Sequence, residues 1–260
     1  MTPTNPEPTP AAKPGALPDA ALVDRPAEQH LGKLLDATVL TMASMAEPGE
    51  SGHHIQRIQL YVQSLARQLR TSAAYAGAWS DEVIDVMVRA CVLHDIGNSA
   101  VPDRILLKPG SLTPDELDVI RTHPVIGRDL IDQIQRQANV STLFLDLARE
   151  ITFGHHERWD GMGYPQRLEG EGNPAPARLM AIADAYEALT SDRVYRAGIP
   201  HAKAVQLIFQ ERGGQFAPDM VDAFIEIQHE FQESATLLAD TEADLQRKID
   251  YMARSIAESP

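Results

Sequence analysis

Residues 155–165 read HHERWDGMGYP and place two adjacent histidines before a loop that contains Gly161, Gly163 and Pro165. Consecutive side chains on a helix point about 100° apart, so one buried helix face cannot hold both rings. Packing alone therefore explains the pair poorly. The stretch indicates a site in which both imidazoles have a chemical role.

Other histidines stand beside carboxylates or beside each other, at intervals of about 28 to 40 residues. Such intervals fit one or two helices, so a helical bundle can bring the groups to one point, as in di-metal carboxylate proteins. Asp184 continues the series inside the apolar stretch AIADAYEALT, where a lone charge is costly and needs a cation. Any one histidine taken alone is more simply a core or surface residue. The full set favours a metal site: His54, His94, Asp95, His123, His155, His156 and Asp184.

Helices are the elements that must position these groups. Apolar residues recur at helical spacing along most of the chain, and alternating strand patterns are nearly absent. The sequence therefore predicts an all-α fold, a helical bundle without a second globular domain. The predicted helices cover roughly residues 31–45, 55–69, 80–91, 143–153, 176–189, 201–210 and 218–231, with two more beginning near Pro114 and Pro124.

Two helix starts carry local capping signals. Ser80 precedes an apolar-periodic stretch and can cap its helix. Thr113 is followed by Pro114, Asp115 and Glu116, which is a capping box with proline at the first helical position.

The chain has 260 residues, of which 43% are hydrophobic, so it can fill a sizeable core. Residues 1–28 are rich in proline and predict a disordered tail, and residues 29–234 form the expected domain. Residues 235–260 predict an amphipathic C-terminal helix with a narrow apolar stripe. This stripe packs on the domain or pairs with a second copy as a homodimer; packing is the simpler alternative.

The formal net charge of -14 argues against a nucleic-acid polymer as partner, because such binding rests on excess lysine and arginine. The single cysteine, Cys91, lies in an apolar run and rules out a disulfide framework within the chain. Neither a signal peptide nor a run of about 18 apolar residues is present. We therefore expect a cytoplasmic protein that is not embedded in a membrane.

The stretch HDIG at residues 94–97 resembles the paired His-Asp signature of HD-domain metal phosphohydrolases, and HHERWDGMGYP resembles the extended motif of the HD-GYP subfamily. The resemblance covers about residues 34–240. Four further segments agree with it: ESGHHIQR at 50–57, VPDRILLKPGSLTPDEL at 101–117, HPVIG at 123–127 and ADAYEALTSDRVYR at 183–196.

This resemblance implies an enzyme that hydrolyses cyclic di-GMP to pGpG or GMP through a hydroxide that bridges two metal ions. Iron or manganese is the expected metal, bound by the seven histidine and aspartate ligands already named. His94 and Asp95 would be the catalytic pair, with Asp95 bridging the ions. Glu50 matches a ligand of a third ion in some members, and an exposed surface carboxylate is an equal alternative.

The resemblance also implies substrate contacts from Tyr164, Arg193 and Arg196, and a loop around Tyr164 that docks diguanylate cyclase domains. Two positions of the expected substrate-binding set depart from the family pattern. Asn98 stands where a lysine is usual, and Glu187 replaces the second aspartate of a DxxDAL pattern. Loss of the lysine removes one positive contact to phosphate.

Two alternatives stay open. The domain could be a catalytically weak module that binds the cyclic dinucleotide or docks a cyclase, or an enzyme that prefers cyclic GMP-AMP. The helix before Glu47 is similar to the linker of response regulators, and we expect the subgroup without a receiver domain.

Overall fold

The computed structural model describes residues 25–50, 52–193 and 196–258. The chain divides into two parts, residues 1–37 and residues 38–260. Most of the predicted tail, residues 1–28, lies outside the described residues. Helix α1 (Arg25–Ala46) begins before the predicted boundary at residue 29, and Leu31, Leu34 and Leu35 are exposed on it.

The described residues form helices and three isolated β-bridges, which confirms the predicted all-α fold. Short 3-10 helices join some of them: η2 (Cys91–Leu93), η3 (Ile96–Ala100) and η4 (Gly170–Gly172). The α-helices after α1 are α2 (Gly52–Arg70), α3 (Asp81–Ala90), α4 (Asp103–Leu106), α5 (Pro114–Ile120), α6 (His123–Ala138), α7 (Leu143–Gly154), α8 (Ala175–Thr190), α9 (His201–Gln210), α10 (Pro218–Leu237) and α11 (Glu242–Glu258).

Side-chain caps fix several helix starts. The hydroxyl oxygen of Ser80 accepts a hydrogen bond from the backbone N–H of Val83 at 3.3 Å and caps α3. Thr113 and Glu116 form the reciprocal capping box at the start of α5. Both caps confirm the sequence prediction, and each satisfies N–H groups that the first helical turn leaves unpaired.

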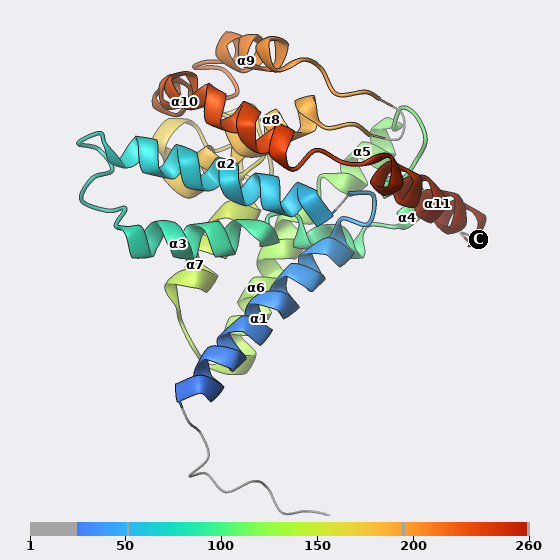
Figure 1. The fold of residues 1–260 in the computed structure, drawn as a ribbon, viewed down its shortest axis with the longest axis horizontal. Coiled ribbons are helices and arrows are strands. Elements are labelled where there is room, and N and C mark those ends of the chain that lie inside the picture. The colour runs from blue at the N-terminus through green and yellow to red at the C-terminus, as the bar shows by residue number, and fades with distance from the viewer. Residues whose placement is uncertain (1–24, 51, 194–195, 259–260) are drawn as a thin grey trace, which may run out of the picture. The chain divides into compact units, whose positions relative to one another are not determined.

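Helix α2 lies alongside α10 and also packs against α3 and α8, while α7 packs against α3, α6 and α8 (Figure 1). Aromatic side chains fill the space between α2, α8 and α10. Tyr61 stacks on Phe231 with ring centroids 4.6 Å apart, and Tyr186 meets the edge of Phe231 at 5.2 Å. These side chains are fully buried, as is Phe224. The cluster thereby fixes α2 and α8 relative to each other, and both helices carry predicted site residues.

The C-terminal segment departs from its predicted bounds. Helix α10 continues to Leu237, past the predicted boundary at residue 234, and α11 follows after a short turn. Helix α11 packs against α4 and buries Met252. Pairing of α11 with a second chain stays a prediction. None of the described helices has the length and apolar character needed to cross a bilayer.

We expect Phe231→Ala to lower the free energy of unfolding by roughly 3 to 5 kcal/mol, because it empties the centre of the aromatic cluster. Urea denaturation followed by circular dichroism measures the change. Phe209→Ala is the matched control, since Phe209 is 55% exposed on α9 and should lose much less. Equal losses in the two variants would contradict the assignment of the cluster as the centre of the core.

Candidate metal centre

Four predicted ligands come together around one carboxylate. We call Asp95, His123, His155 and His156 the Asp95 group; each offers a ligand atom, and these atoms lie within 4.8 Å of one another. Asp95 Oδ1 is 3.0 Å from His123 Nε2 and 3.4 Å from His155 Nε2. A single carboxylate oxygen thus faces two imidazoles from two different helical segments.

A second group lies beside the first. Glu47, His54 and His94 form this Glu47 group; all three are buried and offer ligand atoms within 4.8 Å of one another. Glu47 Oε2 is 2.7 Å from His54 Nε2. His94 joins the groups, because its Nε2 lies 3.9 Å from the second oxygen of Asp95. The arrangement offers two neighbouring positions for cations.

The backbone fixes the orientation of three imidazoles. Nδ1 of His94, His123 and His155 lies 3.1, 2.8 and 3.0 Å from a backbone carbonyl oxygen three or four residues earlier. A carbonyl only accepts hydrogen bonds, so we assign the proton of each ring to Nδ1. Nε2 then presents its lone pair to the groups, which is the arrangement that metal-ligating histidines use.

Several polar atoms of the groups are buried without a hydrogen bond: Glu47 Oε1, His54 Nε2 and Asp95 Oδ1. An unsatisfied buried polar atom costs on the order of 1 to 3 kcal/mol, and native proteins rarely leave one without a reason. A cation at each group would satisfy these atoms. Mixed imidazole and carboxylate ligands suit first-row transition metals better than magnesium. The residues present therefore fit a divalent metal centre.

Burial and neighbouring charges shift the pKa values of Asp95 and His156. Burial raises the pKa of the Asp95 carboxyl, but His94 and His123 outweigh this and hold the pKa well below its usual range. Burial lowers the pKa of His156 well below its usual value, and His155 and His123 lower it further. Asp95 is therefore anionic and His156 neutral, and both can bind a cation.

A glycine allows the close approach that brings Asp95 to His123. Asp95 lies between η2 and η3, and η3 passes the start of α6. A Cβ atom on Gly97 would lie 2.0 Å from the backbone oxygen of His123, so no larger residue fits without displacing the chain. This contact sets the distance between the two ligands.

The HHERWDGMGYP stretch places its histidines at the end of α7 and folds its loop back over them. Tyr164 stacks on His156 with ring centroids 4.9 Å apart. The buried carboxylate of Glu157 accepts hydrogen bonds from the backbone N–H groups of Gln166 and Leu168 at 2.6 and 3.0 Å. A Cβ atom on Gly163 would lie 2.6 Å from the Glu157 backbone, so this position requires glycine. The glycine and the buried carboxylate thus hold Tyr164 against the site.

Asp184 lies outside both groups but acts on them. It is partly buried in α8, and its charge joins that of Asp95 in raising the pKa of His155 against the effect of burial. Its charge thus acts on a member of the Asp95 group. Its role as a direct ligand stays a prediction.

The structure places Glu47, rather than the predicted Glu50, at His54. Glu50 Oε1 lies 3.5 Å from Arg193 Nη2, and Glu50 Oε2 lies 3.4 Å from Lys248 Nζ. Both oxygens therefore face cations of the chain. Sequence reasoning missed Glu47 because it counted one helical turn back from His54. The signal was the Pro48-Gly49 pair, which marks a turn between the helices that carry Glu47 and His54, so helical spacing does not continue across it.

Glu187 lies behind His54. It is 1% exposed, and its Oε1 is 3.1 Å from His54 Nδ1. Arg57 Nε donates to both of its oxygens, at 2.9 and 3.0 Å. This burial fits a role in orienting His54, and the predicted contact of Glu187 with substrate stays a prediction.

The remaining predicted substrate residues differ in exposure. Arg193 and Arg196 are exposed, and Arg196 donates a hydrogen bond to the backbone oxygen of Ala188. Asn98 is buried, and its Oδ1 lacks a hydrogen bond. Their contacts with substrate stay predictions.

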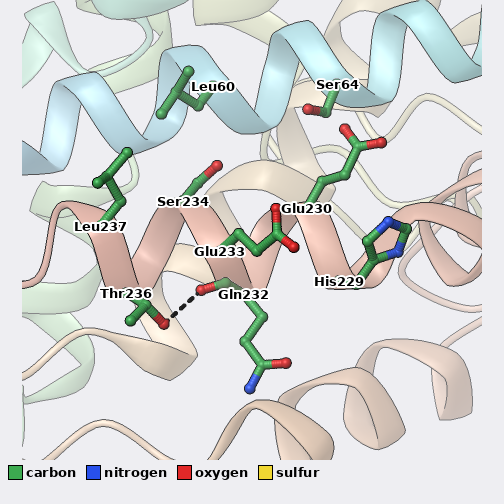
Figure 2. A pocket seen from close by; sticks show the side chains of 9 residues that line it. All are labelled: Leu60, Ser64, His229, Glu230, Gln232, Glu233, Ser234, Thr236 and Leu237. Carbon is green, nitrogen blue, oxygen red and sulfur yellow. Dashed lines mark hydrogen bonds between the residues drawn. The ribbon is translucent and has the colours of Figure 1, made fainter.

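A groove of about 960 Å³ lies elsewhere, along α10 and its neighbour α2 (Figure 2). Leu60 and Ser64 of α2 face Leu237 and Glu230 of α10 across it. Its described lining residues include none from either group. The chemistry is thus concentrated away from this groove.

Residues 39–220 match the family described as the HD domain. The chain belongs to the HD domain family. The matched range contains every member of the two groups. The HD-domain family predicted from residues 94–97 is thereby confirmed, and the assignment of Asp95 as the aspartate of the signature stays a prediction.

Relatives of this HD domain occur in Vibrio cholerae. One named "Probable cyclic di-GMP phosphodiesterase" is 43% identical over 216 residues, covering 82% of this chain and 49% of that protein. One named "Cyclic di-GMP phosphodiesterase" is 39% identical, covering 79% and 42%. One named "3'3'-cGAMP-specific phosphodiesterase 2" is 34% identical, covering 74% and 34%. The chain spans half or less of the length of these relatives, which support its place in the HD-GYP subfamily.

We expect Glu47→Gln to weaken Mn²⁺ binding by at least the roughly 10- to 100-fold that loss of an outer partner of a metal ligand costs. Glu50→Gln, the matched control, should stay within a few-fold of wild type. Equilibrium dialysis with elemental analysis measures both. If Glu50→Gln lost the ion and Glu47→Gln kept it, the sequence prediction would replace the arrangement described.

A second expectation concerns acid stability. Burial raises the pKa of Glu187, but hydrogen bonds from His54 and Arg57 outweigh it and lower the pKa from 4.5 to about 2. The folded pKa lies below the unfolded one, so this stabilisation is present above about pH 4.5 and is lost as the pH falls towards 2. The shift corresponds to roughly 3 kcal/mol.

Glu187→Gln should therefore be less stable at neutral pH and lose less further stability on acidification. Urea unfolding at several pH values, with chelator present, measures the difference. Glu233→Gln on the exposed face of α10 serves as control. A pH dependence in Glu187→Gln as steep as that of wild type would show that the carboxylate is not the source.

Proposed function

We propose that the chain is a metal-dependent phosphodiesterase that hydrolyses cyclic di-GMP to pGpG or GMP. The observation that carries the proposal is the Asp95 carboxylate, which faces His94, His123 and His155 at the junction of two groups of ligand atoms. The names of the relatives support the substrate class.

The reaction requires charge neutralisation, because a phosphodiester is anionic and the chain carries a net charge of -14. When bound, two divalent ions would supply that neutralisation and an activated water near neutral pH. Asp95 and His94 would hold the ions side by side, and His54 with Glu47 would complete one position. Iron and manganese are the ions we propose, and a third ion is not required by the two groups.

Cations and an aromatic ring of the chain provide candidate contacts for the dinucleotide. The guanidinium of Arg121 lies 5.6 Å from the ring centroid of Tyr164, which itself covers His156. The exposed guanidinium of Arg193 lies 3.5 Å from Glu50 Oε1, three residues after Glu47 in the chain. We propose that Tyr164 limits solvent access to the Asp95 group and that the two arginines attract the phosphates.

Two features support a second candidate, a weakly catalytic module that binds the dinucleotide or docks a cyclase domain. Asn98 removes the usual positive charge beside Asp95, and Met162 is 80% exposed at the tip of the loop that ends in Tyr164. An exposed apolar side chain on a well-held loop suits a protein contact.

We expect Asp95→Asn to abolish hydrolysis of cyclic di-GMP, because an amide lacks the negative charge that would hold the cations. The assay uses protein purified and loaded with Fe²⁺ or Mn²⁺ without oxygen, and chromatography of products separates pGpG from GMP. Asp132→Asn, which removes an ion pair with Arg149 on the surface, is the control and should retain activity.

Three results decide between the candidates. Hydrolysis lost only in Asp95→Asn supports the phosphodiesterase. Micromolar binding without hydrolysis by fully loaded wild type selects the binding module. Faster hydrolysis of cyclic GMP-AMP than of cyclic di-GMP, measured side by side, keeps the enzyme and changes its substrate.

A further inference from the structure

A buried arginine links the segment after α10 to the candidate metal centre through hydrogen bonds. Arg57, on α2, is 3% exposed. Its Nη1 donates to the backbone oxygen of Leu238 at 2.7 Å and to Asp240 Oδ1 at 3.0 Å. These residues lie about 180 positions later in the sequence, in the turn before α11. A guanidinium is planar and presents its donors in a fixed fork, so its partners define its orientation.

The other edge of the same guanidinium holds Glu187. Arg57 Nη2 donates to Glu187 Oε1 at 2.6 Å, and that oxygen is 3.1 Å from His54 Nδ1. His54 Nε2 in turn faces Glu47. An unbroken series of contacts therefore runs from Asp240 to a candidate metal ligand.

A buried lysine on α11 holds Asp240 from its other side. Lys248 is 4% exposed, and its Nζ lies 2.9 Å from Asp240 Oδ2 and 3.4 Å from Glu50 Oε2. A buried ammonium is costly unless paired, so Lys248 keeps α11 in place only while Asp240, the nearer of the two carboxylates, accepts its hydrogen bond. Asp240 consequently shares its two oxygens between Arg57 and Lys248.

The orientation of His54 depends on side chains, whereas three other imidazoles are oriented by the backbone. His94, His123 and His155 each direct Nδ1 to a backbone carbonyl close by in the sequence. His54 directs Nδ1 to a side chain, Glu187, which Arg57 must hold. A side-chain partner can change rotamer, whereas a carbonyl of the local backbone cannot.

We propose that Asp240 and Lys248 are positioning residues, which hold His54 in its metal-binding orientation through Arg57 and Glu187. The proposal rests on the metal centre proposed above. It assigns the segment from Leu238 to Lys248 a role in metal retention at the Glu47 group, while the Asp95 group keeps its own backbone supports.

The test measures binding of Mn²⁺ alone to the full chain, by elemental analysis after dialysis against graded chelator. Lys248→Met keeps the apolar stem and removes the charge; Asp240→Asn removes the shared carboxylate. We expect both to release one Mn²⁺ equivalent at a roughly 10- to 100-fold lower chelator concentration than wild type, and to retain the more tightly held equivalent.

Two further variants separate positioning from general damage. Arg247→Met changes the neighbouring, exposed cation of α11, which pairs with Asp244, and should bind Mn²⁺ as wild type does. Lys248→Arg restores a cation and should recover most of the lost affinity. Thermal melting of each variant without metal verifies that it folds.

Several results would overturn the proposal. These are unchanged chelator resistance in folded Lys248→Met and Asp240→Asn, equal loss in Arg247→Met, or release of both equivalents together. A wild-type chain that binds no Mn²⁺ would remove the metal centre as well. Because the readout is metal binding, a loaded but inactive wild type argues against the phosphodiesterase alone.

Discussion

A half-buried carboxylate whose oxygens face imidazoles is the constraint on which the rest of the site depends. Asp95 Oδ1 is buried without a hydrogen bond, while its two oxygens face three histidines from different parts of the chain. Such a group is unfavourable in a protein interior unless a cation joins it. Packing of the apolar core therefore stabilises an arrangement of Asp95 and histidines that is unfavourable without a bound cation.

The aromatic part of the core explains how ligands that are far apart in the sequence are held close together in space. Tyr61 lies about two turns after His54 on α2, Tyr186 directly precedes Glu187 on α8, and Phe231 packs against both tyrosine rings. The same packing that excludes water from the aromatic cluster thus aligns α2 and α8 at the metal centre. Close approach at Gly97 does the equivalent for η3 and α6.

Sequence patterns predicted the parts of this protein that depend on local periodicity and on residue type. The helix spacing, the caps at Ser80 and Thr113 and the histidine series are all visible in one dimension. Glu47 was missed because a turn, not a helix, connects it to His54, so counting by helical turns selected Glu50. Lys248 gave no signal, since a lysine on a charged helix is normally solvated and only the tertiary contact with Asp240 buries it.

The carbonyl contacts of His94, His123 and His155 have a consequence for ion choice. Imidazole rings that are hydrogen-bonded to the local backbone keep their orientation before an ion binds. The entropy of ordering these rings is therefore lost during folding and not during metal binding. Affinity at nitrogen and oxygen sites is lowest for Mn²⁺ and Fe²⁺ among the first-row divalent ions, so binding of the proposed iron or manganese depends on metal availability as well as on affinity. The ion found in the protein would consequently reflect which divalent metals the surrounding cell keeps exchangeable.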